Sequence, residues 1–239
     1  MKLSTQISIS GLIAASILFT GCGGGDSAST TASGICNTGS ALVFNDDNWN
    51  YYDNANTTVA PSGTTELEFM ADGVFAASGV VFLNESMVPP YSVEFEYSIY
   101  DEDGNLSSFN SADGIAVMLS KDESPYTSTT PPNGGSRGFI TGSGYGVHFS
   151  TYGSRVIKIA DGSNNDLITP VSASPSVYSH GLWRKVKVDV LTDRIDVTYE
   201  GTTTSYSGAI NDTYDSVGFG AATGGADGQH KIRNVTCTN

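Results

Sequence analysis

The sequence is poor in cysteine, in histidine and in charged residues. Basic residues are the scarcest of the charged ones, and this already excludes anionic partners. Only 11 of its 239 residues are Lys or Arg, against 25 Asp or Glu, which gives a net charge of −14. A chain this acidic is repelled by nucleic acid and by anionic lipid headgroups, so we expect neither as a partner. Charged residues are only 15% of the chain, and its polar surface must therefore be built mainly from Ser, Thr, Asn and Tyr. A neutral ligand suits such a surface better than a polyanion.

Long apolar runs are also missing, and the one apolar stretch of note lies near the N-terminus. Ile7–Phe19 follows Met1-Lys2 and falls short of the roughly 20 residues that span a bilayer, so we predict that residues 1–21 are a signal peptide. Its end, Leu18–Cys22, resembles the bacterial lipobox, which implies acylation (palmitate) of Cys22. We therefore expect a lipoprotein anchored in the bacterial outer membrane, on its periplasmic or cell-surface side. The alternative is a conventional signal peptide with an incidental cysteine.

The residues after Cys22 predict a tether and then one domain. Residues 23–34 contain no large apolar side chain and cannot offset their ordering entropy by burial, so residues 22–34 are predicted to form a flexible tether. Residues 35–239 remain, about 200 residues, which is enough for one large core. Neither a second linker nor an internal repeat occurs in the sequence.

Alternating and continuous apolar runs predict that this domain is all-β. Residues 92–99 alternate between polar and apolar side chains, and residues 185–190 and 195–199 do so on either side of a short connection, as in a hairpin. Ile115–Leu119 are five consecutive apolar residues, which is typical of a strand buried on both faces. Short strands punctuated by Gly, Pro, Asn and Ser favour a β-sandwich or jelly roll.

Four short motifs point to one family. Residues 112–116 (Ala-Asp-Gly-Ile-Ala), 134–139 (Gly-Gly-Ser-Arg-Gly-Phe), 145–152 (Tyr-Gly-Val-His-Phe-Ser-Thr-Tyr) and 217–225 (Val-Gly-Phe-Gly-Ala-Ala-Thr-Gly-Gly) resemble, in the same order, the motifs of legume-type (L-type) lectins. The resemblance implies a concanavalin A-like jelly-roll β-sandwich of two antiparallel sheets. It also implies that the protein binds a glycan or polysaccharide.

The resemblance also names a candidate binding site. A sugar offers hydroxyl groups and one less polar face, so its site needs a carboxylate, backbone donors and an aromatic ring. We expect Asp113 to be an exposed carboxylate at the mouth of the apolar strand, with Gly114 allowing a sharp turn behind it. The carbohydrate-binding residues that the resemblance implies are Asp113, Gly135, Tyr152, Ser154, Gly225 and Ala226.

The family's metal ligands are replaced in this sequence. Legume-type lectins hold manganese and calcium with a Glu and an Asp on a strand and an Asn in the next loop, and calcium helps to fix the Ala-Asp peptide. The matching positions here are His148, Ser150 and Ser154. Hard cations need several oxygen ligands, so we predict that no metal cofactor is bound here. His148 by itself is more readily explained as a packed side chain than as a ligand.

Three cysteines allow one disulfide once Cys22 is assigned to lipid. In an exported protein the remaining pair, Cys36 and Cys237, is most simply a disulfide that closes the domain end to end. The alternative is two free thiols. The resemblance agrees with a bridge, because L-type lectin folds place the first and last strands side by side.

Two other functions remain open beside glycan binding. The same architecture carries glycoside hydrolases, which need two carboxylates about 5–9 Å apart. Glu94 and Glu96 are the one pair worth naming, but they alternate with core residues like an ordinary solvated face, so we predict that the protein is not an enzyme. The third reading is a structural or protein-adhesive surface lipoprotein in which the sugar site has decayed.

Overall fold

The structure is a computed structural model that describes residues 34–101, 112–142 and 144–239. The predicted signal peptide (residues 1–21), the predicted lipidation site Cys22 and all of the predicted tether except Gly34 lie outside the described residues. The described residues form one compact unit. Within the described ranges, no helix is long and apolar enough to cross a membrane.

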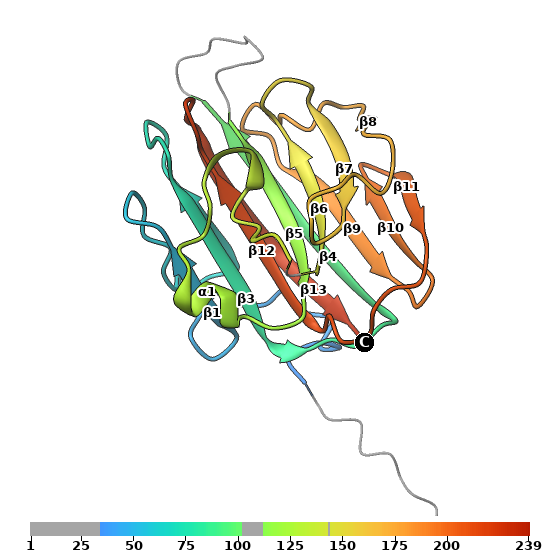
Figure 1. Ribbon diagram of the computed structural model, residues 1–239. Helices are drawn as coiled ribbons and strands as arrows, with labels where there is room; N and C mark the ends of the chain where they lie inside the picture. Colours follow the sequence, from blue (N-terminus) through green and yellow to red (C-terminus); the bar gives the residue numbers. More distant parts are fainter. Residues whose placement is uncertain (1–33, 102–111, 143) are drawn as a thin grey trace, which may run out of the picture. The chain divides into compact units, whose positions relative to one another are not determined.

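The unit is a sandwich of two antiparallel sheets, as the sequence predicts (Figure 1). One sheet has the order β1-β3-β12-β5-β6-β7-β8, with β1 Trp49–Asp53, β3 Ser78–Ser86, β12 Ser216–Ala222, β5 Gly114–Ser120, β6 Gly144–Ser150, β7 Val156–Ala160 and β8 Val171–Ser172. The other has the order β11-β10-β9-β4-β13-β2, with β11 Thr202–Ser207, β10 Arg194–Tyr199, β9 Arg184–Val190, β4 Tyr91–Tyr100, β13 Gln229–Thr238 and β2 Glu66–Met70. A short helix, α1 (Ser124–Ser128), and a 3₁₀ turn, η1 (Gly134–Ser136), lie between β5 and β6.

The strands follow the apolar patterns that predicted them. β4 buries Val93, Phe95, Tyr97 and Ile99, while Glu94 and Glu96 are only partly buried. β9 and β10 pair as the predicted hairpin, with Val188 opposite Val197. β5 is buried at every position, which confirms the expectation of a strand covered on both faces.

The main core fills the space between the two sheets. Phe219 on β12 lies 4.9 Å from Phe95 and 6.0 Å from Trp49, measured between ring centroids, so aromatic rings from both sheets meet there. On β5, Ile115, Val117 and Leu119 belong to the same cluster. Burial of these rings and branched side chains between the sheets holds the sheets together.

A second apolar cluster covers the outer face of the seven-stranded sheet. Ala116 and Met118, which alternate with the inward residues of β5, pack with Tyr126 of α1 and Phe139 behind η1. The Tyr126 hydroxyl contacts Met118 Sδ at 3.3 Å and accepts the Ile140 N–H at 3.1 Å. The connection between β5 and β6 is therefore folded back over the sheet, as Figure 1 shows.

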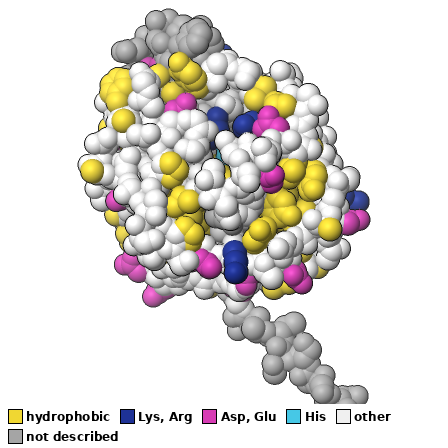
Figure 2. Space-filling model, in the orientation of Figure 1, with side chains coloured by type: hydrophobic (Ala, Val, Ile, Leu, Met, Phe, Trp, Pro, Cys, Tyr) yellow, Lys and Arg dark blue, Asp and Glu magenta, His cyan; other side chains and the backbone are white. Residues whose placement is uncertain are grey.

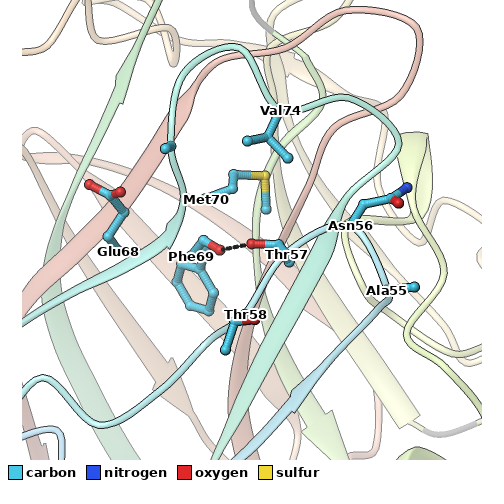
Figure 3. A pocket seen from close by; sticks show the side chains of 9 residues that line it. Ala55, Asn56, Thr57, Thr58, Glu68, Phe69, Met70 and Val74 are labelled. Carbon is cyan, nitrogen blue, oxygen red and sulfur yellow. Dashed lines mark hydrogen bonds between the residues drawn. The ribbon is translucent and has the colours of Figure 1, made fainter.

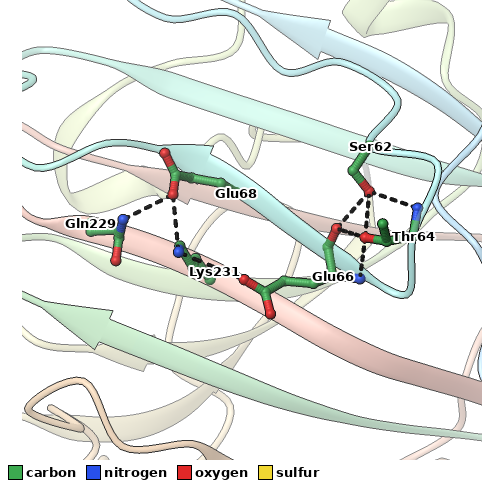
Figure 4. Close-up of polar contacts among 6 residues, drawn as sticks. All are labelled: Ser62, Thr64, Glu66, Glu68, Gln229 and Lys231. Atoms are coloured by element: carbon green, nitrogen blue, oxygen red, sulfur yellow. Dashed lines mark hydrogen bonds and ion pairs between the residues drawn. The ribbon is translucent and has the colours of Figure 1, made fainter.

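The outer face of the six-stranded sheet is polar. Lys231 on β13 lies 3.6 Å from Glu66 and 3.3 Å from Glu68, and Gln229 donates to Glu68 at 2.8 Å (Figure 4). These are ion pairs at a partly exposed surface, which contribute little to stability individually. Charged and polar side chains thus keep this face of the sheet hydrated.

The two ends of the described unit are joined covalently. Cys36 and Cys237 form a disulfide across 201 residues, as predicted. The Asn37 N–H donates to the Cys237 carbonyl at 2.9 Å, and the Leu42 N–H donates to the Val235 carbonyl at 2.7 Å. The segment before β1 is therefore bound along β13 by backbone hydrogen bonds as well as by the bridge.

Reduction of this disulfide should destabilise the domain. Closing a loop of about 200 residues stabilises the folded state by roughly 4 kcal/mol or more in the chain-entropy model. We expect the urea midpoint of the soluble domain to fall when dithiothreitol is added. The double variant Cys36→Ser/Cys237→Ser should start at the lower midpoint and not respond to the reductant. An equal midpoint for the reduced and oxidised protein would contradict this expectation.

Candidate functional site

Four chain segments meet where β12 ends and β5 begins. The Asp113 N–H donates to the Ala222 carbonyl at 2.7 Å, and the Thr151 N–H donates to the Asp113 carbonyl at 3.1 Å. The Gly134 N–H donates to the Thr223 carbonyl at 3.0 Å. These bonds tie together the start of β5, the η1 turn, the end of β6 and the loop after β12, so the motifs that are far apart in sequence form one locus.

Asp113 is buried, which corrects the expectation of an exposed carboxylate. The residue is only 6% exposed, because the η1 turn and the loop after β12 close over it. Its Oδ2 has no hydrogen-bond partner among the described residues, and a β-carbon placed on Gly224 would lie 2.9 Å from that atom. The carboxylate therefore faces the narrow space between Gly134 and Gly224. The Ala112–Asp113 peptide is cis.

Burial controls the charge of this carboxyl. It raises the pKa of Asp113 above its usual value, because removing a carboxylate from water disfavours its charged form. The nearby Arg137 guanidinium opposes this shift and does not cancel it. The site thus holds an acid that ionises less readily than a surface aspartate and has an oxygen free to accept a hydrogen bond.

Arg137 is a central residue of the site that the sequence analysis did not identify. It follows η1 with φ 54°, is 3% exposed, and burial lowers its pKa to about 10. Its Nε donates to the backbone carbonyl of Asp113 at 3.0 Å, its Nη1 to the Gly135 carbonyl, and its Nη2 to the Ser150 hydroxyl. The only signal in the sequence was an arginine inside a glycine-rich loop next to a predicted carboxylate.

Gly114 makes the approach of Arg137 and β6 possible. Its φ is +118°, and a β-carbon there would lie 1.9 Å from the Phe149 carbonyl oxygen and 3.2 Å from Arg137 Nε. No residue with a side chain fits this position without moving the backbone of β6. The glycine after Asp113 thus serves close packing as well as the predicted turn.

The structure brings the predicted glycine positions close to Asp113. Gly135 is exposed in the η1 turn, one residue from Gly134, and its carbonyl accepts from Arg137. Gly225 is exposed in the loop after β12, whereas Ala226 is buried and its carbonyl accepts the Gly224 N–H at 3.2 Å. Ala226 therefore shapes the loop from inside, and Gly225 stands at the surface.

Tyr152 and Ser154 lie on the loop that leaves β6. Tyr152 is 46% exposed and follows Thr151, whose N–H is bonded to the Asp113 carbonyl. Its side chain thus lies at the surface, one residue along the chain from Thr151. Ser154 is exposed two residues further on, and no described hydrogen bond joins it to Asp113.

The residues where the family holds its metals do not fit a divalent cation. Ser150 accepts a hydrogen bond from Arg137, so a permanent cation already lies against that position. His148 is fully buried against Phe139, 5.6 Å between ring centroids, and lies opposite Lys158 on β7. Burial and the positive charges of Arg137 and Lys158 hold the pKa of His148 well below its usual value. In the described part of the chain, no three His, Cys, Asp or Glu side chains converge as metal ligands.

The turn at Ala76 is hydrogen-bonded both to the loop after β12 and to Asn56, a residue that lines a pocket beside β2. The Ala76 N–H donates to the Gly224 carbonyl at 3.0 Å, and the Ala76 carbonyl accepts from Asn56 at 2.9 Å and Asn133 at 3.1 Å. Asn56 also lines a pocket of about 400 Å³, whose wall includes Met70 and Val74 (Figure 3).

The candidate carboxylates for glycoside hydrolysis are occupied by ion pairs. Glu94 pairs with Lys185 at 3.1 Å and Glu96 with Arg233 at 2.6 Å, both on the polar face of the six-stranded sheet. Residues 134–138 also have the Gly-x-Ser-x-Gly spacing of a hydrolase nucleophile, but Ser136 lies in a 3₁₀ turn and donates to the Asn133 carbonyl at 2.8 Å. Glu94 and Glu96 are therefore each engaged with a basic side chain, and the Ser136 hydroxyl is bonded to backbone carbonyls and not to a base.

Figure 2 shows that charge is sparse on the face of the molecule that is turned to the viewer in Figure 1. Lys, Arg, Asp and Glu atoms appear as small separate groups among uncharged polar and apolar atoms. This agrees with the low content of charged residues in the sequence.

Comparisons with known proteins find structural similarity without sequence similarity. No family model matches the chain, and no curated protein matches it. Among solved structures, the VIP36 exoplasmic/lumenal domain in its Ca²⁺/Man3GlcNAc-bound form is similar with a TM-score of 0.59 and 12% identity, covering 80% of this chain and 83% of that one.

Two further solved structures are also similar to this chain. The lectin from Bauhinia forficata in complex with GalNAc has a TM-score of 0.56 and 16% identity, covering 81% of this chain and 95% of that chain. The legume lectin-like domain from Entamoeba histolytica has a TM-score of 0.54 and 10% identity, covering 82% and 96%. Together with the sheet order and the locus around Asp113, these similarities show that the chain has the fold of the legume-type (L-type) lectins.

Proposed function

We propose that this protein is a non-catalytic glycan-binding protein whose site is centred on Asp113. The observation that carries the proposal is the buried carboxylate with Oδ2 unpartnered among the described residues, facing two glycine-bearing turns. A buried carboxylate that lacks a partner is costly unless a ligand supplies hydrogen-bond donors. Sugar hydroxyl groups are neutral donors of that kind, and they suit the acidic chain that repels anions.

The surroundings of Asp113 provide what else a sugar needs. Gly134 and Gly224 carry no side chain on either side of the carboxylate, so the narrow space between them leaves room for a sugar hydroxyl group to approach Oδ2. The exposed ring of Tyr152 would cover the less polar face of the sugar. Gly225, at the surface of the loop after β12, would contact the substituents that distinguish one monosaccharide from another, while Ser154 would contribute a hydroxyl at the edge.

The structural neighbours support a carbohydrate ligand, since VIP36 and the Bauhinia lectin hold Man3GlcNAc and GalNAc. The alternative is a structural or protein-adhesive role, and the loss of metal-ligand residues at Ser150 and Ser154 favours it. We also propose that the domain is anchored by an acylated Cys22 in the bacterial outer membrane, because the lipobox-like segment and the Gly/Ser tether precede it directly.

Removing the charge of Asp113 should abolish most glycan binding. Asp113→Asn keeps the shape of the side chain but loses a charged acceptor, which corresponds to a roughly 10- to 100-fold weaker affinity. The measurement is a glycan array of the soluble domain, residues 34–239, including mannose- and GalNAc-terminated glycans. Asp212→Asn is the matched control, because Asp212 is exposed in the loop before β12, at the opposite end of that strand. Equal binding by Asp113→Asn and wild type would refute the site.

Glycan binding should not require a divalent cation. Arg137 bonds Ser150 and Lys158 lies opposite His148, the two strand positions that match the family's metal ligands, so adding EDTA should leave the array signal unchanged and adding Ca²⁺ should not increase it. A signal that EDTA abolishes and Ca²⁺ restores would contradict this reading of His148, Ser150 and Ser154. No signal in either buffer would favour the structural or adhesive role.

As the pH is lowered, glycan binding should begin to weaken at a higher pH than is usual for a site that depends on an aspartate. The ionised carboxylate accepts the hydroxyl donors, so binding is full above the pKa of Asp113 and is lost as the pH falls through it. Burial raises that pKa, and Arg137 is the group that opposes the rise. Burial lowers the pKa of His148 well below its usual value and that of His230 to about 4, so both rings are neutral at pH 7 and His230 reaches its pKa only at the acid end of the titration. Titrating affinity from pH 7 to pH 4 tests this, with the folded state followed by circular dichroism. An affinity that stays constant down to pH 4 would contradict it.

A further inference from the structure

We propose that the buried guanidinium of Arg137 is the positioning cation of the Asp113 site, and that it takes over the task for which the fold family uses a bound metal. The inference deepens the proposed function, and rests on it only for calling the locus a glycan site. According to this proposal, the Arg137 side chain holds the site in place. Arg137 is a positioning residue and does not itself touch the ligand.

The contacts of Arg137 join three separate segments. Nε reaches the Asp113 carbonyl at the start of β5, Nη1 reaches the Gly135 carbonyl in the η1 turn, and Nη2 reaches Ser150 at the end of β6. All three acceptors are oxygens, as the ligands of a hard cation would be. A guanidinium carries five N–H donors in a planar fork and accepts nothing, so one side chain can hold three oxygens in fixed directions.

The charge of Arg137 lies near the Asp113 carboxylate without occupying its Oδ2. Arg137 bonds the backbone carbonyl of Asp113 and leaves Oδ2 of the carboxylate without a described partner. The arginine therefore supports the ionised state of Asp113 through space and does not occupy the oxygen that a ligand would use. A direct bidentate ion pair would instead have neutralised and filled the site.

The other basic groups nearby do not share this task. Burial lowers the pKa of His148 well below its usual value and that of His230 to about 4, so both rings are neutral at pH 7. Lys158 is paired with Asp166 at 3.0 Å. Of the basic groups described around the locus, Arg137 is thus the one whose positive charge acts on Asp113, and it is 3% exposed, so solvent screens it little.

Two variants of Arg137 separate its charge from its hydrogen bonds. Arg137→Met removes both, while Arg137→Lys keeps the charge but loses the fork. Every non-glycine residue shares the strain of φ 54° at this position, so that strain cancels in the comparison. Arg233→Met is the matched control, because Arg233 is a partly buried arginine that pairs with Glu96 and stacks on Trp183 at 4.0 Å, on the other sheet.

Both measurements are made without a sugar. The first is the Asp113 carboxyl titration, followed by ¹³C NMR of the soluble domain. The second is hydrogen exchange of the Thr151 amide, because this N–H shares the Asp113 carbonyl with Arg137 Nε. Amides of β9 and β10 report global stability in the same sample.

Arg137→Met should raise the pKa of Asp113 further, since the opposing positive charge is gone. It should also speed exchange at Thr151 by about tenfold or more relative to β9 and β10, as expected for losing a hydrogen bond from a charged group. Arg137→Lys should keep the Asp113 titration close to wild type and still speed exchange at Thr151. Arg233→Met should change neither quantity relative to the global signal.

Three results would overturn the proposal. One is an unchanged Asp113 titration in folded Arg137→Met. The second is a Thr151 amide in Arg137→Lys that is as protected as in wild type, which decides the matter even if Arg137→Met fails to fold. The third is a shift of the Thr151 amide signal on adding Ca²⁺ to wild type, which EDTA reverses. If the glycan array shows no binding, the proposed function is refuted. The titration and the hydrogen-exchange measurements would still test the role of Arg137.

Discussion

The structure depends on the burial of β5 on both faces. Ile115, Val117 and Leu119 face the other sheet, so the opposite face, with Ala116 and Met118, must be covered as well. Leaving that face in water would expose apolar surface in the middle of a seven-stranded sheet. The connection from β5 to β6 folds back over it, and this single requirement carries η1 and Arg137 to the start of β5. The candidate site is thus a consequence of covering the core.

The same burial explains the electrostatics of the site. Once the connection closes over the start of β5, Asp113 loses most of its water, and its pKa rises. An uncompensated buried charge is expensive, and a buried arginine without acceptors would be equally so. The two residues compensate each other through the backbone: Arg137 satisfies its donors on three oxygens while its charge favours the ionised carboxylate. Oδ2 of the carboxylate has no hydrogen-bond partner among the described residues.

Much of the fold was predictable because it rests on local periodicity. The alternation in β4, the β9–β10 hairpin and the continuous apolar run of β5 each specify which faces are buried. The pairing of Cys36 with Cys237 followed from counting cysteines. The site was predictable only as a set of segments. Motif order indicated that Asp113, the glycine-rich loop and the loop after β12 belong together, but not that Asp113 would be buried.

The sequence by itself determined the all-β class, the two-faced burial of β5 and the disulfide, because these depend on side-chain pattern and residue type. It indicated the segments of the candidate site only through the resemblance of their motifs to those of L-type lectins. Only the tertiary structure decided that Asp113 is buried, that Arg137 lies against its carbonyl, and that Glu94 and Glu96 are tied up in ion pairs. Those features depend on which distant backbone oxygens and side chains come within hydrogen-bonding distance. That distance is set by the packing of the β5–β6 connection onto the sheet, and no periodicity in the chain records it.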